Sequence, residues 1–183
     1  MTLIISVLTH EAVLQASDRR LVWVASDGST RVRNDNRNKA VMLGQRMFFA
    51  YTGIADIGVN RESTDLWLGR TLGELVRQFH DQADLLEALA ARATDRFAHG
   101  RLRSVPLARR GHEFAIVGWA RFPSSPNLKS YFGLVTNMRA VDGTFLSEPT
   151  DGFRVTWFAS NPTCPGECSR LVSRLPALTS RRC

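Results

Sequence analysis

MTLIISVLTHEAVLQASDRR, residues 1–20, contains two short apolar runs, 3–8 and 12–17, separated by a polar break around His10. Two such runs joined by polar turn residues are typical of a β-hairpin. The first run begins directly after Thr2. We therefore expect the chain to open with a strand that starts at the N-terminus itself and pairs with the strand that follows it.

Beyond this hairpin the sequence predicts further strands, then two helices, then strands again. Apolar runs bounded by turn residues predict strands over residues 21–26, 41–53 with a break at 44–46, 113–122, 130–138 and 154–160. Polar composition predicts loops over 31–38 and 101–111. A last helix is expected near residue 168, interrupted by Pro176.

The two central helices are predicted from apolar residues at helical spacing, one after Ser63 and one from about Asp84. Their expected apolar positions are Leu66, Leu68, Leu72, Leu75, Val76 and Phe79, followed by Leu85, Leu89, Ala93 and Phe97. Hairpin-linked strands on both sides of a helical pair indicate antiparallel sheets with helices packed against them. We predict one α+β domain over residues 1–183, with 161–183 as a tail of undefined structure.

Composition argues against several classes of function. The net charge of +7 comes from 22 arginines and two lysines that are scattered along the chain, whereas a nucleic-acid surface is typically a denser basic stripe. No apolar stretch reaches the roughly 20 residues of a membrane span, and we expect a cytoplasmic protein. Cys164, Cys168 and Cys183 are odd in number and lack a nearby histidine, so we expect reduced thiols.

The common signatures of catalytic and cofactor sites are missing. The sequence has no phosphate-binding glycine loop, HExxH motif or GxSxG elbow. His10, His80, His99 and His112 are isolated in sequence, and we expect each of them on the surface or in a turn. We expect neither a metal nor a cofactor.

Thr2 could provide a catalytic nucleophile without any of those signatures. Methionine is generally removed when the next residue is small, and removal of Met1 would give Thr2 a free α-amino group. A hydroxyl needs a base to become a good nucleophile, and an N-terminal amine can be that base. The ordinary pKa of such an amine, about 7.7–8.0, leaves a useful neutral fraction at physiological pH.

Residues 2–53 resemble the N-terminal half of proteasome β-type subunits, including the bacterial two-ring peptidase, in the N-terminal-nucleophile hydrolase family. Members begin with threonine and a short hydrophobic strand, and reach an aspartate at the end of the second strand. Here Asp18 follows Thr2 by sixteen residues and Arg20 stands two further on. Lys39 opens the strand KAVML, and Gly53 follows it by fourteen.

The resemblance implies a four-layer α/β/β/α sandwich of antiparallel sheets, here incomplete at its C-terminal end, that self-associates, with rings possible. It implies a threonine peptidase, acting on a peptide or another amide, in which Thr2 attacks the carbonyl, Lys39 held by Asp18 supplies positive charge, and Gly53 N–H binds the oxyanion. The residues that would border the substrate pocket are Leu21, Arg37, Tyr51 and Ala55.

This chain also departs from the family pattern. The segment between Asp18 and Lys39 is longer by five residues, which we place in the polar loop 27–38. Ile54 stands where the family has a second glycine, and Ser160 and Ser169 are the hydroxyls that could support the nucleophile.

Each feature also has a plain structural alternative: a strand start, a polar strand end, a solvated lysine and a turn glycine. Two other functions stay open, a catalytically silent member of the fold that serves as a binding or structural subunit, and an arginine-rich nucleic-acid-binding domain.

Overall fold

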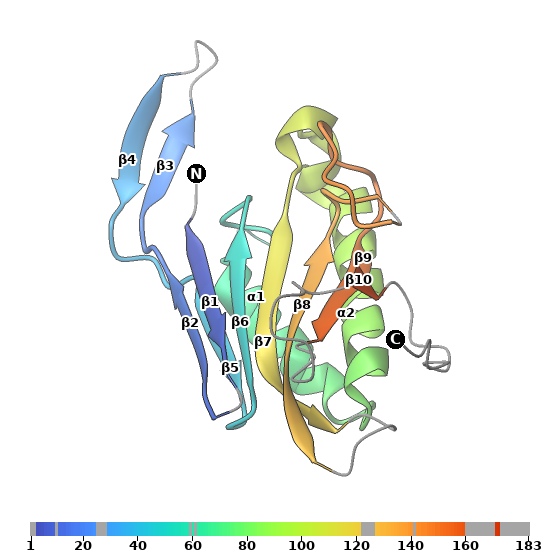
Figure 1. The fold of residues 1–183 in the computed structure, drawn as a ribbon. Helices are drawn as coiled ribbons and strands as arrows, with labels where there is room; N and C mark the ends of the chain where they lie inside the picture. Colours follow the sequence, from blue (N-terminus) through green and yellow to red (C-terminus); the bar gives the residue numbers. More distant parts are fainter. Residues whose placement is uncertain are drawn as a thin grey trace.

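The fold combines antiparallel sheets with two α-helices (Figure 1). A computed structural model describes residues 3–9, 11–24, 29–58, 60, 62–121, 127–140, 142–159 and 171–172 of the 183-residue chain. The strands are β1 (Ile4–Leu8), β2 (Val13–Ser17), β3 (Leu21–Val24), β4 (Thr30–Asn34), β5 (Ala40–Leu43), β6 (Met47–Thr52), β7 (Glu113–Arg121), β8 (Leu128–Thr136), β9 (Arg154–Ala159) and β10 (Leu171–Val172). The helices are α1 (Thr64–Leu75) and α2 (Gln82–Ala98), with short 3₁₀ helices at Gly100–Ser104 and Leu107–Arg109. The predicted α+β class with antiparallel sheets is confirmed.

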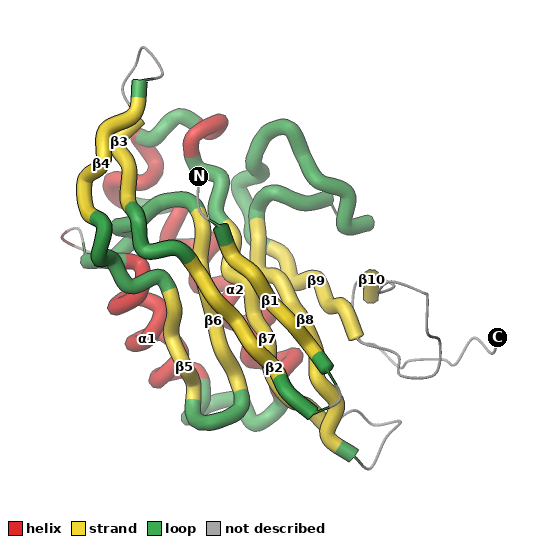
Figure 2. The backbone as a smooth tube through the Cα atoms, turned by 60° about the vertical axis from the view of Figure 1, so that its left-hand side comes forward, coloured by secondary structure: helices red, strands yellow, loops and turns green. Residues whose placement is uncertain are grey.

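A six-stranded sheet in the order β10-β9-β8-β7-β6-β5 forms the centre of the molecule. Both helices lie on one of its faces, and the β1–β2 hairpin lies across the other, over β6, β7 and β8 (Figure 2). The β3–β4 hairpin extends beyond the end of this sheet. The described residues therefore form three layers: helices, central sheet and hairpin.

The core lies between the helices and the central sheet. Asp81 caps the start of α2, because its side chain accepts the N–H groups of Ala83 and Asp84 in the first turn. All four apolar positions predicted for α2 are buried. Each such leucine contributes roughly 1.5–3 kcal/mol relative to an exposed one. The sheet and helix side chains that meet here include Met47, Phe49, Phe114, Ile116, Leu68, Leu72, Leu86 and Leu89.

The buried face of α1 differs in part from the predicted one. Leu66 and Val76 are 62% and 42% exposed, whereas Trp67 and Thr71 are buried. Helical positions three and four apart share a face, and the buried set around Leu68 follows that rule once Trp67 is included. The apolar residues of this run fit two overlapping faces of a helix. Packing against the sheet buries the face that contains Trp67.

The β1–β2 hairpin has two unlike faces. The Gln15 amide donates to the carbonyl of Ala115 at 3.2 Å, which ties the hairpin to β7. Its outward side chains are apolar and exposed: Leu3 by 62%, Ile5 by 53%, Val7 by 46% and Leu14 by 63%. A contiguous exposed apolar face of this kind is often an interaction surface.

One prediction of secondary structure was wrong. Residues 30–34 form strand β4 instead of part of a loop, pairing with β3 through a ladder with a register shift at Leu21/Val22. All five β4 side chains are exposed, so the strand forms through backbone pairing and leaves no apolar alternation in the sequence. The region predicted as a last helix lies outside the described residues except for Leu171 and Val172, which form β10 against β9.

No helix in the described part of the chain is long and apolar enough to cross a membrane. The three cysteines, together with Ser160, Ser169 and His10, lie outside the described residues.

Candidate active site

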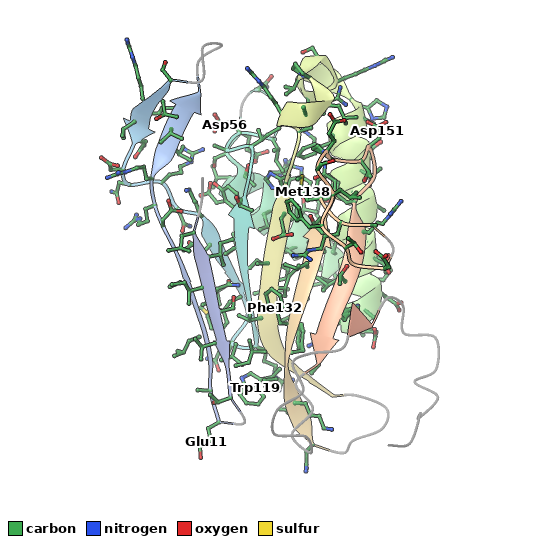
Figure 3. All side chains as sticks on the ribbon, turned by 45° about the horizontal axis from the view of Figure 1, so that its top comes forward. Glu11, Asp56, Trp119, Phe132, Met138 and Asp151 are labelled. Carbon is green, nitrogen blue, oxygen red and sulfur yellow. The ribbon has the colours of Figure 1, made fainter. Side chains whose placement is uncertain are left out.

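Four strand ends meet at one end of the molecule. Because β1 and β2 are antiparallel, the start of β1 lies beside the end of β2, with Ile4 opposite Ser17. In the same way Ala40, at the start of β5, lies opposite Ala50 near the end of β6. Figure 3 shows Asp56, in the loop after β6, at this end, and Glu11, in the β1–β2 turn, at the other. The predicted catalytic residues of the described part come from these strand ends.

Asp18 and Lys39 form an ion pair in this region. Lys39 Nζ lies 2.9 Å from Asp18 Oδ1 and donates to the Arg20 carbonyl at 2.5 Å. The Lys39 side chain is 2% exposed, and that of Asp18 is 31% exposed. A buried ammonium is expensive to desolvate unless it is paired and hydrogen-bonded, as it is here. The predicted contact between these two residues is confirmed.

Thr2 itself lies outside the described residues. Its covalent neighbour Leu3 accepts a hydrogen bond from the Asp18 backbone N–H at 3.0 Å. The end of β2 that carries Asp18 is therefore held directly against the residue that follows Thr2.

Gly53 follows β6 and has a backbone conformation that favours glycine, with φ of 106°. A Cβ at this position would overlap the Gly111 carbonyl oxygen and lie 2.8 Å from His112 Nδ1. Two strand residues back, the Tyr51 N–H donates to the Lys39 carbonyl at 3.1 Å, so Gly53 lies just past the level of Lys39. The backbone conformation and the close packing against residues 111 and 112 therefore both require glycine at this position.

His112 was missed by sequence reasoning, which placed it on the surface or in a turn. It is 1% exposed, and its Nδ1 accepts the Ile54 N–H at 3.1 Å. Burial lowers the pKa of His112 to about 3, so the ring is neutral at ordinary pH. The only local signal is its place just before an apolar strand, which does not distinguish it from a solvated strand-end histidine.

The four predicted pocket residues lie in different environments. Leu21 begins β3 and is partly buried. Ala55 is also partly buried, and its carbonyl accepts the Thr64 N–H at 2.8 Å, fixing the start of α1. Tyr51 is 1% exposed, and its hydroxyl donates to the Asn38 carbonyl at 3.2 Å. Burial, helped by the Asp65 carboxylate, raises the pKa of Tyr51 to about 12.

Arg37 is engaged by acidic groups of the protein. Its guanidinium lies 2.9 Å from Asp56 Oδ1 and 3.8 Å from Asp65 Oδ1, and Arg33 also reaches Asp56 at 2.8 Å. The network joins β4 and the segment after it to the loop before α1, through Asp56, and to the first turn of α1, through Asp65. Because Arg37 already faces two carboxylates, its attraction for an acidic ligand is reduced.

An open hollow of about 400 Å³ adjoins the ion pair. It is lined by Asp18, Arg19, Arg20 and Asp35, so its wall carries both signs of charge. The Arg20 guanidinium lies 2.8 Å from Asp35 in an exposed pair. The partial exposure of Asp18 is therefore on the side where a ligand could approach.

No cluster of three or more His, Cys, Asp or Glu with the spacing of a metal site occurs among the described residues. Comparisons with models of known protein families, with curated proteins and with solved structures find no match.

Proposed function

We propose that this protein is a threonine-type amidohydrolase of the N-terminal-nucleophile class that hydrolyses peptides, with Thr2 as nucleophile after removal of Met1. The observation that carries the proposal is the buried Lys39–Asp18 ion pair beside the residue that follows Thr2. Such pairs contribute little to stability once desolvation is counted, and ionisable groups buried at the edge of a hollow are common at catalytic sites.

In the proposed reaction Thr2 Oγ attacks the carbonyl carbon of the scissile amide, and its proton passes to its own α-amine, directly or through a water molecule. The positive charge of Lys39 favours the alkoxide, while Asp18 holds the ammonium in place. The carbonyl oxygen becomes an oxyanion that the Gly53 N–H stabilises. One donor of this kind is typically worth about 10²–10³ in rate.

Collapse of the tetrahedral intermediate breaks the C–N bond, and the leaving amine takes the proton from the α-ammonium of Thr2. An ester between substrate and Thr2 remains. Water then attacks this ester with the same α-amine as base, which releases the acid and restores the Thr2 hydroxyl. Each step uses only residues of this chain and water.

The proposal extends to the fold and to assembly. In a four-layer sandwich the β1–β2 hairpin belongs to the second sheet, and its outer face is covered. The exposed apolar side chains on that face are the feature that agrees with such a layer or with self-association. A ring of subunits, a cytoplasmic location and an amide substrate belong to the same proposal.

Intact mass and covalent labelling test the proposal. The mature chain should have lost Met1, and a peptide β-lactone or epoxyketone should add once, at Thr2. Thr2→Ala should abolish both the adduct and peptide hydrolysis. Retained Met1, or a chain with a free Thr2 that forms no adduct and cleaves no peptide, would reject the enzyme.

A catalytically silent binding subunit is the second candidate. It is favoured by the exposed apolar face of the β1–β2 hairpin, because a protein that acts through partners needs such a surface. This candidate predicts an unreactive Thr2 and a Thr2→Ala variant that behaves like the wild type in every assay.

A further inference from the structure

The turn after β6 rests on the buried ring of His112. The Ile54 N–H donates to His112 Nδ1 at 3.1 Å, and Gly53 packs against the backbone of Gly111 and His112 so closely that a side chain is excluded. Within the described residues no hydrogen bond engages the Gly53 N–H. Of the two successive amide N–H groups, that of Ile54 is thus bound by the histidine, and that of Gly53 makes no hydrogen bond to the described residues.

The ring of His112 is held in a single orientation. Its backbone N–H donates to Asn137 Oδ1 at 2.9 Å, and its ring packs at an angle against Phe114, with centroids 4.6 Å apart. Tyr51 stacks on it at 5.9 Å, and Phe97 packs at 5.5 Å. An imidazole so enclosed cannot turn away from the Ile54 amide without opening the core.

The tautomer follows from the hydrogen bond. Because Nδ1 accepts from Ile54, the proton of the neutral ring is on Nε2. Nε2 is buried and has no hydrogen-bond partner among the described residues. An apolar side chain at position 112 would not bury an unpaired N–H group such as Nε2. The simplest reason for a histidine here is therefore that its Nδ1 accepts the hydrogen bond from Ile54.

We propose that His112 is a positioning residue for the oxyanion site: by binding the Ile54 N–H it fixes the 53–54 turn so that the Gly53 N–H faces the reacting carbonyl. This inference rests on the proposed function, since it assigns a role within the same site. His112 exchanges no proton and touches no substrate. Its effect is on geometry, which matters because catalysis depends on donors aimed at the developing charge.

Three variants separate positioning from packing. His112→Leu removes the acceptor, whereas His112→Asn keeps a polar group at the position of Nδ1. Leu89→Ala truncates the core in α2, away from the turn, and serves as the matched control for lost stability. Periodate oxidation, which needs only a free N-terminal threonine, shows whether Thr2 is exposed in each protein.

The readout is the inactivation of Thr2 by a peptide β-lactone, followed by intact mass. We expect the maximal inactivation rate of His112→Leu to fall about 10²-fold with the half-saturating concentration changed less than threefold. The maximal inactivation rate of His112→Asn should be at least tenfold higher than that of His112→Leu. Leu89→Ala should react like the wild type at a temperature where it is folded.

The outcomes distinguish the two proposals. A wild-type chain that is oxidised by periodate but never acylated overturns the proposed function and this inference together. A wild-type chain that is acylated, with His112→Leu folded and equally fast, overturns this inference alone. Equal losses in His112→Leu and Leu89→Ala also overturn it, because they would show that stability alone governs the rate.

Discussion

The ammonium of Lys39 lies 2.9 Å from the carboxylate of Asp18, and the two residues belong to different layers of the molecule. Asp18 ends the β1–β2 hairpin, and Lys39 precedes the edge strand β5 of the central sheet. Their exposure is unequal, since the lysine side chain is 2% exposed and the aspartate 31%. The pair therefore joins the hairpin to the sheet, and its two members should respond differently to substitution.

Asp18→Ala should lower the free energy of unfolding more than Lys39→Met. Removing the carboxylate leaves a buried ammonium with less compensation, which costs about 3 kcal/mol, whereas removing the lysine leaves a carboxylate that water can reach, costing about 1 kcal/mol. The double variant should be more stable than Asp18→Ala alone. Urea unfolding at pH 7 measures all three, and the reverse order would contradict this account of the pair.

Both single variants should lose at least about 10²-fold in the acylation rate of Thr2, because each removes the positive charge or its support. Lys39→Arg should not restore activity, since the planar guanidinium does not match the site of a compact ammonium. If a folded Lys39→Met protein is acylated at the wild-type rate, Lys39 has no role in the reaction of Thr2.

Gly53→Ala should be damaging in stability and in reactivity. The added Cβ meets the Gly111 carbonyl oxygen and His112 Nδ1, and the φ of 106° is strained for alanine. We expect a loss of about 2–4 kcal/mol and no detectable acylation. Gly73→Ala in α1 is the matched control, because a Cβ there meets nothing within 4 Å and alanine is the better helix former. Thermal unfolding should rank Gly73→Ala at or above the wild type.

The sequence predicts well those strands and helices whose apolar side chains form a continuous run or recur at helical spacing. The two apolar runs of the first hairpin form β1 and β2, and the four-residue spacing of Leu85, Leu89 and Ala93 marks the buried face of α2. Strand β4 could not be predicted in this way, because its side chains are all exposed and its pairing is made by the backbone. In α1 the choice of face depended on where Trp67 fits.

In the candidate site, too, some contacts could be predicted from the sequence and others could not. The spacing of Asp18 and Lys39 within a recognised pattern predicted their contact, which the ion pair confirms. The contact between Ile54 and His112 joins residues 58 positions apart and follows no periodicity. Only tertiary structure brings the start of β7 beside the turn after β6, so no local pattern could have selected His112 among the four histidines.

Stability should fall as the pH is lowered below about 6.5. His112 has a pKa of about 3 in the folded protein and an ordinary value of 6.5 when unfolded. Between these values the unfolded chain binds the extra proton, so the free energy of unfolding decreases by up to about 1.4 kcal/mol per pH unit. Above pH 6.5 this contribution is complete and constant.

Denaturant unfolding from pH 7.5 to 5.0 checks this slope, and His112→Asn is the control because it carries no titrating ring. The two proteins should differ in slope below pH 6.5 and run parallel above it. Identical slopes across the whole range would show that His112 binds a proton as readily in the folded protein as in the unfolded chain, which would contradict its lowered pKa.

The charge of Arg37 should have little influence on substrate choice, although the resemblance to proteasome β-type subunits implies that Arg37 borders the substrate pocket. Its guanidinium is held by Asp56 at 2.9 Å, with Asp65 at 3.8 Å, so its charge is neutralised from within. Arg20 lines the open hollow and is paired with Asp35 in an exposed contact, which water screens. Arg20 is thus the cation better placed to meet an acidic ligand.

Fluorogenic peptides with Glu or Leu before the scissile bond measure the ratio of kcat/KM for the two residues. Arg37→Gln should change that ratio less than about twofold, whereas Arg20→Gln should lower it about fivefold, the effect of losing one screened charge contact worth about 1 kcal/mol. Arg37→Gln should also reduce stability, because Asp56 loses one of the two arginines that pair with it in the described part of the chain. A large change in the ratio for Arg37→Gln with none for Arg20→Gln would show that Arg37 determines the selectivity. It would also mean that Asp56 releases the Arg37 guanidinium when substrate binds.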